Sequence, residues 1–231
     1  MDYNRINFDS VDSTSSYARR NASLLETPCI ITASHQTSGR GRQGKSFFSP
    51  KDTGLYMTLL IQDEPESALI TPAAAVAVCK AIESLTDIEP TIKWVNDIFV
   101  SNKKVCGILS ECFRENGKTY ISVGVGINLT TTEFPADLIQ AASLGVECSK
   151  ERLSLLIADG ITEYISNPDD EYILNEYRKR LFVIGQKITY EKNGVLCEAT
   201  VCDINDKCNL IVKRNDSSLD ILSSGEISIK L

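Results

Sequence analysis

One helix limits the fold more than any other feature of this sequence. Thr71-Pro72 marks its start, because proline is favoured in the first turn of a helix. Residues 73–85 then carry apolar side chains on almost every side: Ala73, Ala74, Ala75, Val76, Ala77, Val78, Ala81 and Ile82. A helix without a polar face lies inside a protein, and its small residues allow a sheet to approach closely. We therefore expect a layered domain in which this helix covers a β-sheet.

The strands of that sheet are indicated by short runs of apolar and β-branched residues. These runs lie at 29–33, 55–61, 92–94, 98–100 and 105–111. Asn96-Asp97 is a typical turn sequence between two of them. Short strands joined by tight turns favour an antiparallel or mixed sheet.

A further strand, 120–128, is expected to have one bare face. Ile121, Val123, Val125 and Ile127 alternate with Ser122, Gly124, Gly126 and Asn128. The twofold period of a strand puts all the small residues on the same side. Because glycine weakens a strand, this side either packs tightly under a helix or forms a surface on which a ligand lies. The sequence leaves both interpretations open.

The C-terminal part of the chain changes from helices to short strands. Ser149 caps an amphipathic helix, and a second helix spans about 170–181. After Gly185, short β runs alternate with turn sequences, which is typical of a small all-β barrel. The predicted fold class is α+β, with a mixed sheet flanked by helices in residues 1–183 and a small SH3-like barrel in residues 184–231.

Charge and composition exclude several classes of protein. The 231 residues include 24 Lys and Arg against 31 Asp and Glu, a net charge of −7. Proteins that coat nucleic acid normally have a basic excess, so no nucleic-acid partner is expected. The sequence has neither a signal peptide nor an apolar run of membrane-spanning length, which predicts a cytoplasmic protein without a membrane partner. The eight cysteines form no Cys-x-x-Cys pair and are expected to be buried and reduced.

A basic, glycine-rich loop is the most informative motif. Residues 38–46 hold Arg40, Arg42 and Lys45 among three glycines. Glycine lets backbone N–H groups approach an anion, and arginine binds carboxylate or phosphate oxygens through paired hydrogen bonds. The loop therefore predicts an anion site, although a solvated turn is the simpler alternative. It also fits the phosphate-loop pattern of nucleotide triphosphatases, but Pro50 prevents the helix that such a loop must open.

Two further segments carry polar side chains suited to binding. Residues 93–97, Lys-Trp-Val-Asn-Asp, combine a cation, an aromatic ring, an amide and a carboxylate at one turn. Taken alone, this is a core tryptophan beside an ordinary turn. Lys104 opens a strand that, taken alone, is an ordinary edge strand. The functional interpretation depends on the occurrence of these segments together with the basic loop.

The set of segments resembles the biotin protein ligases. The similar segments, in the same order as in that family, are Asp12-Ser13-Thr14, Gln36 with 39–44, 93–97, 104–109 and 124–128. Residues 225–228 also resemble the end of the family's C-terminal barrel. The resemblance implies the class II synthetase-like biotin-lipoate ligase fold. It also implies a two-step reaction that uses ATP, biotin and Mg²⁺: biotin and ATP form biotinoyl-AMP and pyrophosphate, and a lysine of a biotin carboxyl carrier protein, of acetyl-CoA carboxylase or another biotin-dependent carboxylase, then attacks the adenylate.

The same resemblance implies roles for individual residues. Biotin would be bound by Ser13, Thr14, Gln36, Arg40, Lys104, Gly107, Gly124 and Gly126. ATP and the adenylate would be bound by Arg42, Lys45, Lys93, Trp94, Asn96 and Asn128, with Trp94 and Asn128 on the adenine. The catalytic residues would be Lys104, Arg40 and Asp97. Asp97 would also bind Mg²⁺ or orient the attacking lysine.

Some residues depart from the family pattern. Val95 stands where proline is usual, Lys45 where arginine is common, and Phe47 where tryptophan is frequent. Lys45 lacks the fork of an arginine, so a weaker hold on phosphate is expected. Residues 12–14 come so early that neither a DNA-binding domain nor a repressor function is expected. Lipoate or octanoate ligation and a non-catalytic biotin or nucleotide sensor remain alternatives, and the sequence is compatible with a monomer or a homodimer.

Overall fold

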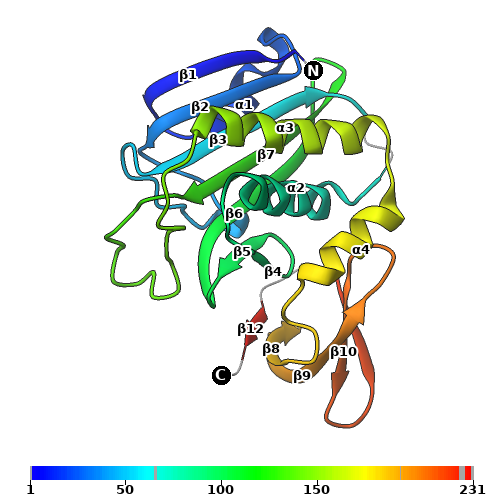
Figure 1. The fold of residues 1–231 in the computed structure, drawn as a ribbon. Coiled ribbons are helices and arrows are strands. Elements are labelled where there is room, and N and C mark those ends of the chain that lie inside the picture. Colours follow the sequence, from blue (N-terminus) through cyan, green and yellow to red (C-terminus); the bar gives the residue numbers. More distant parts are fainter. Residues whose placement is uncertain (1, 65–66, 193, 224–226, 230–231) are drawn as a thin grey trace.

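The structure is a computed structural model that describes residues 2–64, 67–192, 194–223 and 227–229. Its main layer is a seven-stranded sheet (Figure 1). In spatial order the strands are β1 (Asn4–Val11), β2 (Cys29–Gln36), β3 (Gly54–Gln62), β7 (Lys118–Asn128), β6 (Lys103–Glu115), β5 (Asp97–Val100) and β4 (Thr91–Lys93). β1 runs parallel to β2, and the other neighbouring strands are antiparallel. The prediction of a mixed sheet is confirmed.

Strand β1 is not evident from the sequence. It lies at the edge of the sheet, and most of its residues are exposed. An edge strand with one partly buried face has weak hydrophobic periodicity. Ile6 and Phe8, which pack against the smaller core on the α1 side, are too few to make the pattern recognisable.

The helices cover both faces of this sheet. Helix α1 (Thr14–Asn21) and the 3-10 turn η1 (Ala22–Leu24) lie on one face, and α2 (Ile70–Leu85) and α3 (Lys150–Ser166) lie on the other (Figure 1). α2 is buried along most of its length, as predicted. Ser149 caps α3, as predicted, by accepting a hydrogen bond from Arg152 N at 3.1 Å. Within the described residues, no helix is long and apolar enough to cross a membrane.

The two faces of β7 pack against different layers of the fold. Its aliphatic side chains, from Ile121, Val123, Val125 and Ile127, are buried in the main core with α2 and α3. Gly124 faces α1 instead, and a Cβ built on it would lie 2.5 Å from Ser15 Oγ. Tight packing under a helix, one of the two interpretations of this glycine face, therefore holds at Gly124.

Helix α4 (Asp170–Arg180) leads from α3 to a second sheet (Figure 1). In spatial order the strands of this sheet are β11 (Leu219–Leu222), β10 (Leu210–Arg214), β9 (Val195–Ile204), β8 (Lys187–Lys192) and β12 (Ile227–Ile229), and all neighbours are antiparallel. The sheet is consistent with the predicted SH3-like domain. Among the described residues, however, β11 and β12 do not pair, so the predicted barrel is not closed.

The two sheets share one hydrophobic core. Ile92 and Trp94, from the first sheet and its adjoining turn, belong to the same buried cluster as Tyr190 and Leu210 of the second. Phe182, which follows α4, packs its ring 5.5 Å from that of Phe99. The second sheet is therefore docked against the first. The exact domain limits, 1–183 and 184–231, stay a prediction.

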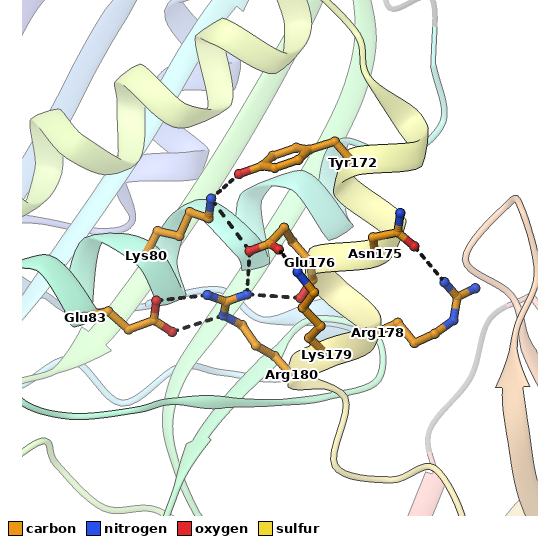
Figure 2. A network of polar contacts seen from close by, with 8 residues as sticks. All are labelled: Lys80, Glu83, Tyr172, Asn175, Glu176, Arg178, Lys179 and Arg180. Carbon is orange, nitrogen blue, oxygen red and sulfur yellow. Dashed lines mark hydrogen bonds and ion pairs between the residues drawn. The ribbon is translucent and has the colours of Figure 1, made fainter.

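A network of charged residues attaches α4 to α2 (Figure 2). Arg180 donates two hydrogen bonds to the carboxylate of Glu83, at 3.0 and 2.9 Å, and one to Glu176 at 2.9 Å. Glu176 also accepts a hydrogen bond from Lys179 at 2.6 Å. These bonds lower the pKa of Glu176 from 4.5 to about 2, and the bond from Lys179 has the largest effect. Partial burial acts in the opposite direction, and the bond from Arg180 lowers the pKa further. The network holds α4 by its charged face.

The cysteines correct one sequence-based expectation. Five are buried, but Cys148 is half-buried, and Cys112 and Cys202 are exposed. Cys202 follows the buried Val201 on β9, so strand alternation turns its side chain away from the core. Cys112 lies in the outer part of the β6–β7 hairpin.

The charged network predicts a pH-dependent contribution to stability. Glu176→Gln should lower the free energy of unfolding by about 1–2 kcal/mol at pH 7, because it removes charge-assisted hydrogen bonds. The folded-state pKa of Glu176 is depressed, so its stabilisation is complete above its ordinary pKa of 4.5 and is lost as the pH falls toward 2. Urea denaturation of both proteins between pH 7 and pH 2.5 measures the difference.

The difference between wild type and variant should shrink below pH 4.5. Glu171→Gln, in the exposed first turn of the same helix, is the matched control and should change stability by at most about 0.5 kcal/mol. If the stability difference between wild type and Glu176→Gln were constant over the whole pH range, the depressed pKa of Glu176 would be contradicted.

Candidate active site

A cavity of about 440 Å³ opens beside the first sheet. Its walls come from the start of α1, the end of β2, the basic loop, the turn after β4, the glycine-bearing parts of β6 and β7, and β12. The predicted site residues that line it are Ser13, Thr14, Gln36, Arg40, Arg42, Lys45, Lys93, Trp94, Asn96, Asp97, Lys104, Gly107, Gly124 and Gly126. The fold thus brings together every residue predicted for the site except Asn128.

One corner of the cavity is a hydrogen-bonded polar group at the start of α1. Ser13 caps the helix, and Thr14 donates to Gln36 Oε1 from its backbone N at 2.9 Å and from its Oγ1 at 3.2 Å. Thr58 Oγ1 donates to Thr14 Oγ1 at 2.9 Å, and Gln36 Nε2 donates to Ser49 Oγ at 2.8 Å. Because these side chains hold one another, their polar atoms have fixed positions, which suits recognition of a small polar ring.

The basic loop is a small hairpin. Arg40 and Ser46 form an antiparallel bridge, Gly41 N donates to Lys45 O at 2.7 Å, and Phe47 N donates to Gly39 O at 2.8 Å. The 3-10 turn η2 (Arg42–Gly44) forms its tip, where Gly44 has a φ of 77° that glycine adopts without strain. No helix follows Ser46, so the rejection of the phosphate-loop pattern is confirmed.

Phe47 lies across the glycines of the neighbouring strands. A Cβ built on Gly126 would lie 2.5 Å from the ring of Phe47, and one built on Gly107 would lie 3.3 Å from it. These two positions therefore form a floor that an aromatic ring can approach because side chains are missing there. At Gly126 the close neighbour is a side chain of the protein itself, and the second interpretation of this face, a surface on which a ligand lies, stays a prediction.

Each of three site cations has its own acceptor in the protein. Lys104 Nζ lies 2.7 Å from Asp97 Oδ1. Arg40 donates two hydrogen bonds to the carboxylate of Glu111, both 3.0 Å long. Arg42 donates to Asn96 Oδ1 at 2.8 Å. The pairs place positive charge around the cavity, each cation in a set position from which it can also meet an incoming anion.

The turn after β4 is held by bonds on several sides. Asn96 Nδ2 donates to Ile108 O at 2.9 Å and to Asp97 Oδ1 at 3.2 Å. The indole of Trp94 is 5% exposed, and its N–H donates to Cys208 O at 2.8 Å. Trp94 is thus chiefly a core residue with one edge on the cavity, so the alternative of a core tryptophan is right in part.

Asn128 lies outside the cavity lining. It is buried, and its Nδ2 donates to Ala142 O at 3.0 Å. Its Oδ1 has no hydrogen-bond partner among the described residues. Ala142 follows the cavity-lining segment 137–141, so Asn128 supports that segment from behind. Its contact with adenine stays a prediction.

Several site residues are not predicted from the sequence. Glu111 shares a strand face with Gly107, so the period of two in β6 is a signal that identifies it. Segment 137–141 lines the cavity without regular structure, apart from an isolated bridge between Ala141 and Lys104, and carries no such signal. From the predicted terminal motif 225–228, Ile227 and Ser228 line the cavity, whereas residues 225 and 226 lie outside the described residues.

The described residues contain no group of three His, Cys, Asp or Glu side chains that could hold a metal ion. Mg²⁺ often binds through one or two carboxylates, water and the phosphates of a substrate, so it does not need such a group. Asp97, on the cavity wall and 24% exposed, fits the role of a single protein ligand.

Comparisons with known families identify the class of protein. Residues 7–128, more than half of the chain, match the model of the Biotin/lipoate A/B protein ligase family. The chain therefore belongs to the Biotin/lipoate A/B protein ligase family. Within it, residues 183–230 match the Biotin protein ligase C terminal domain, in agreement with the family suggested by the sequence motifs.

Individual relatives agree with this assignment. The bifunctional ligase/repressor BirA of Bacillus spizizenii is 32% identical over 130 residues, which cover 54% of this chain and 40% of that protein. BirA of Escherichia coli is 28% identical over 244 residues, 95% of this chain and 72% of the relative. This chain thus spans less than half of the Bacillus relative. A structure of biotin protein ligase from Aquifex aeolicus in complex with biotin and ATP has the same fold, with a TM-score of 0.81 at 24% identity and 98% of each chain covered.

The glycine floor predicts a graded response to added methyl groups. Gly126→Ala should displace the Phe47 ring and loosen the loop hairpin, because its Cβ would lie 2.5 Å from a ring carbon. Hydrogen exchange at the Gly41 and Phe47 amides, both bonded within the loop, should accelerate by roughly tenfold. Gly107→Ala, at 3.3 Å from the same ring, is the matched control with a smaller effect expected. An equal or larger effect of Gly107→Ala would refute this account.

Proposed function

We propose that this chain is a biotin protein ligase that activates biotin with ATP and transfers it to a lysine of a biotin carboxyl carrier protein. The observation that carries the proposal is the cavity, in which three protein-anchored cations lie around a glycine floor, partly covered by the Phe47 ring, beside a rigid polar corner. Family membership supports a ligase of biotin or lipoate, and the match of residues 183–230 to the Biotin protein ligase C terminal domain supports the choice of biotin over lipoate or octanoate.

The first step needs positive charge where the carboxylate of biotin meets the α-phosphate of ATP. A carboxylate oxygen of biotin attacks the α-phosphorus of ATP, and the bond from that phosphorus to the bridging oxygen breaks to release pyrophosphate. Both reactants are anions, so fixed cations must offset their repulsion in a site with little water. We assign this role to Lys104 and Arg40 near the reacting groups, and to Arg42 and Lys45 along the phosphates.

Asp97 has two proposed tasks in the first step. Its carboxylate, 2.7 Å from Lys104 Nζ, sets the position of that ammonium group between the two anions. It is also our candidate ligand for Mg²⁺, which when bound with ATP would supply further positive charge to the phosphates. The acceptor Asn96 holds Arg42 in the same manner.

The second step transfers the acyl group. The amine of the carrier lysine attacks the carbonyl carbon of the adenylate, the bond to the phosphate oxygen breaks, AMP leaves, and the amine gives up a proton. AMP is a good leaving group, so placing the amine close to the carbonyl contributes more than a strong base. Asp97 lies where a carboxylate could orient that amine beside Lys104.

Individual contacts are proposed on the same basis. Biotin would lie against the polar corner of Ser13, Thr14 and Gln36, above the floor formed by Gly107, Gly124 and Gly126. The adenine side would be bounded by the exposed edge of Trp94, by Lys93 and by the segment that Asn128 supports.

A pyrophosphate-release assay tests the proposal. Purified protein with ATP should release pyrophosphate with biotin and not with lipoate or octanoate, and a carrier domain added afterwards should be labelled. Lys104→Ala should slow release by roughly 10²–10³-fold, the cost typical of removing one group that stabilises developing charge. Release with lipoate alone would favour the sister activity, and tight biotin binding without release would favour a sensor.

Asp97 is tested separately. Asp97→Asn should slow both adenylation and transfer by at least about tenfold, since Lys104 would lose its charged partner. The two rates are measured by pyrophosphate release and by single-turnover transfer from preformed adenylate, with thermal unfolding as the control for intact structure. Unchanged rates in both steps would remove Asp97 from the mechanism.

A further inference from the structure

We propose that Tyr177, on α4, is a positioning residue for the ATP side of the site. It acts by holding the turn that carries Asn96 and Asp97. This inference rests on the proposed function, and it adds to the predicted site a residue that lies outside the cavity lining.

The hydroxyl of Tyr177 reaches the turn from behind. The side chain is fully buried, and its OH donates a hydrogen bond to Val95 O at 3.0 Å. Val95 directly precedes Asn96 and Asp97, the acceptors that hold Arg42 and Lys104. This buried hydrogen bond is therefore one of the contacts that fix the backbone from which both acceptors project.

Tyr177 can hold the turn because α4 is itself held on two other sides. Arg180 forms the paired bonds to Glu83 of α2 (Figure 2). Arg178 donates to Asp203 Oδ1 at 2.8 Å and to Ile204 O at 3.3 Å, both at the end of β9. Tyr177 and Arg178 point about 100° apart around the helix, whereas Tyr177 and Arg180, three residues apart, are only about 60° apart. Tyr177 and Arg180 therefore face the neighbouring turn and α2, and Arg178 points to the end of β9.

The backbone around the turn adds to this arrangement. Phe182 N donates to Ile92 O at 3.3 Å, and Leu181 and Ile92 form an isolated parallel bridge. The strand before the turn is thus tied to the residues that follow α4. Since Trp94 is also bound to Cys208 O, the turn is held between α4 and the second sheet.

The polar corner of the cavity, where the ring end of biotin would lie, does not depend on these contacts. It comes from α1, β2, β3 and the segment between β2 and β3, and its hydrogen bonds run among Thr14, Gln36, Ser49 and Thr58. Loss of the Tyr177 hydroxyl should therefore lower kcat/KM for ATP more than it weakens the binding of biotin. A purely structural role would affect neither substrate selectively.

Tyr164 provides a matched control. It is also a buried tyrosine, 5% exposed, and its hydroxyl lies 2.6 Å from Ser67 Oγ and 2.6 Å from Asp170 Oδ1, away from the turn. Tyr177→Phe and Tyr164→Phe each remove one buried hydroxyl and keep the ring. Both should lower the thermal midpoint to a similar extent.

The kinetic test uses the full chain. In biotin-dependent ATP–pyrophosphate exchange, Tyr177→Phe should lower kcat/KM for ATP by about 5- to 20-fold, while the Kd for biotin alone, from calorimetry, should stay within twofold. Tyr164→Phe should leave both quantities within twofold of wild type. Any of three results would overturn the inference. The kcat/KM of Tyr177→Phe for ATP could stay within twofold of wild type, its Kd for biotin could rise by the same factor as kcat/KM falls, or both quantities could equal those of Tyr164→Phe.

A second readout needs no enzymatic activity. Trp94 is the single tryptophan of the chain, so intrinsic fluorescence reports on the turn itself. Quenching of Trp94 by acrylamide should increase at least twofold in Tyr177→Phe and stay unchanged in Tyr164→Phe. A wild-type chain without exchange activity would refute the proposed function, whereas unchanged quenching in Tyr177→Phe would refute the positioning role.

Discussion

Three of the cations that line the cavity are each held by an acceptor built into the protein. Without acceptors, Arg40, Arg42 and Lys104 would repel one another at the short distances that a 440 Å³ space allows. Glu111, Asn96 and Asp97 provide those acceptors, and all three belong to β6 or to the turn and strand beside it. The first sheet meets this requirement by placing the turn after β4 next to the strand that carries Lys104 and opposite the basic loop.

The second requirement is rigidity behind the cavity. Acceptors fix a charge only if their own backbone is fixed. The turn at residues 94–96 has no regular structure of its own, and it is held by a tyrosine of α4, the carbonyl of Cys208 between β9 and β10, and the side-chain hydrogen bonds of Asn96. The second sheet and α4 therefore contribute to the geometry of a site whose lining comes mostly from the first sheet and its loops.

Much of this molecule was predictable from local patterns. The buried helix α2, the Ser149 cap and the alternation in β7 follow from periodicity and capping, and the structure confirms them. β1 was missed because an exposed edge strand has little hydrophobic pattern, and segment 137–141 because irregular backbone has none. The burial of Trp94 depends on Cys208, far away in the sequence, and no local pattern contains such information. The glycines of β7 show that one strand face can have two neighbours, since its positions meet a helix at Gly124 and an aromatic ring at Gly126, and the sequence pattern identifies neither neighbour.

The walls of the cavity come from opposite ends of the sequence. Ser13 lies near the start, and Ile227 and Ser228 of β12 lie near the end. A binding site made from such distant segments is complete only when the chain has reached its native topology, because its walls are contacts between residues far apart in the sequence. A molecule that fills this cavity therefore shifts the folding equilibrium of the whole chain in proportion to its concentration and affinity, and not merely that of one loop. Substrate supply and the amount of folded protein are thereby linked.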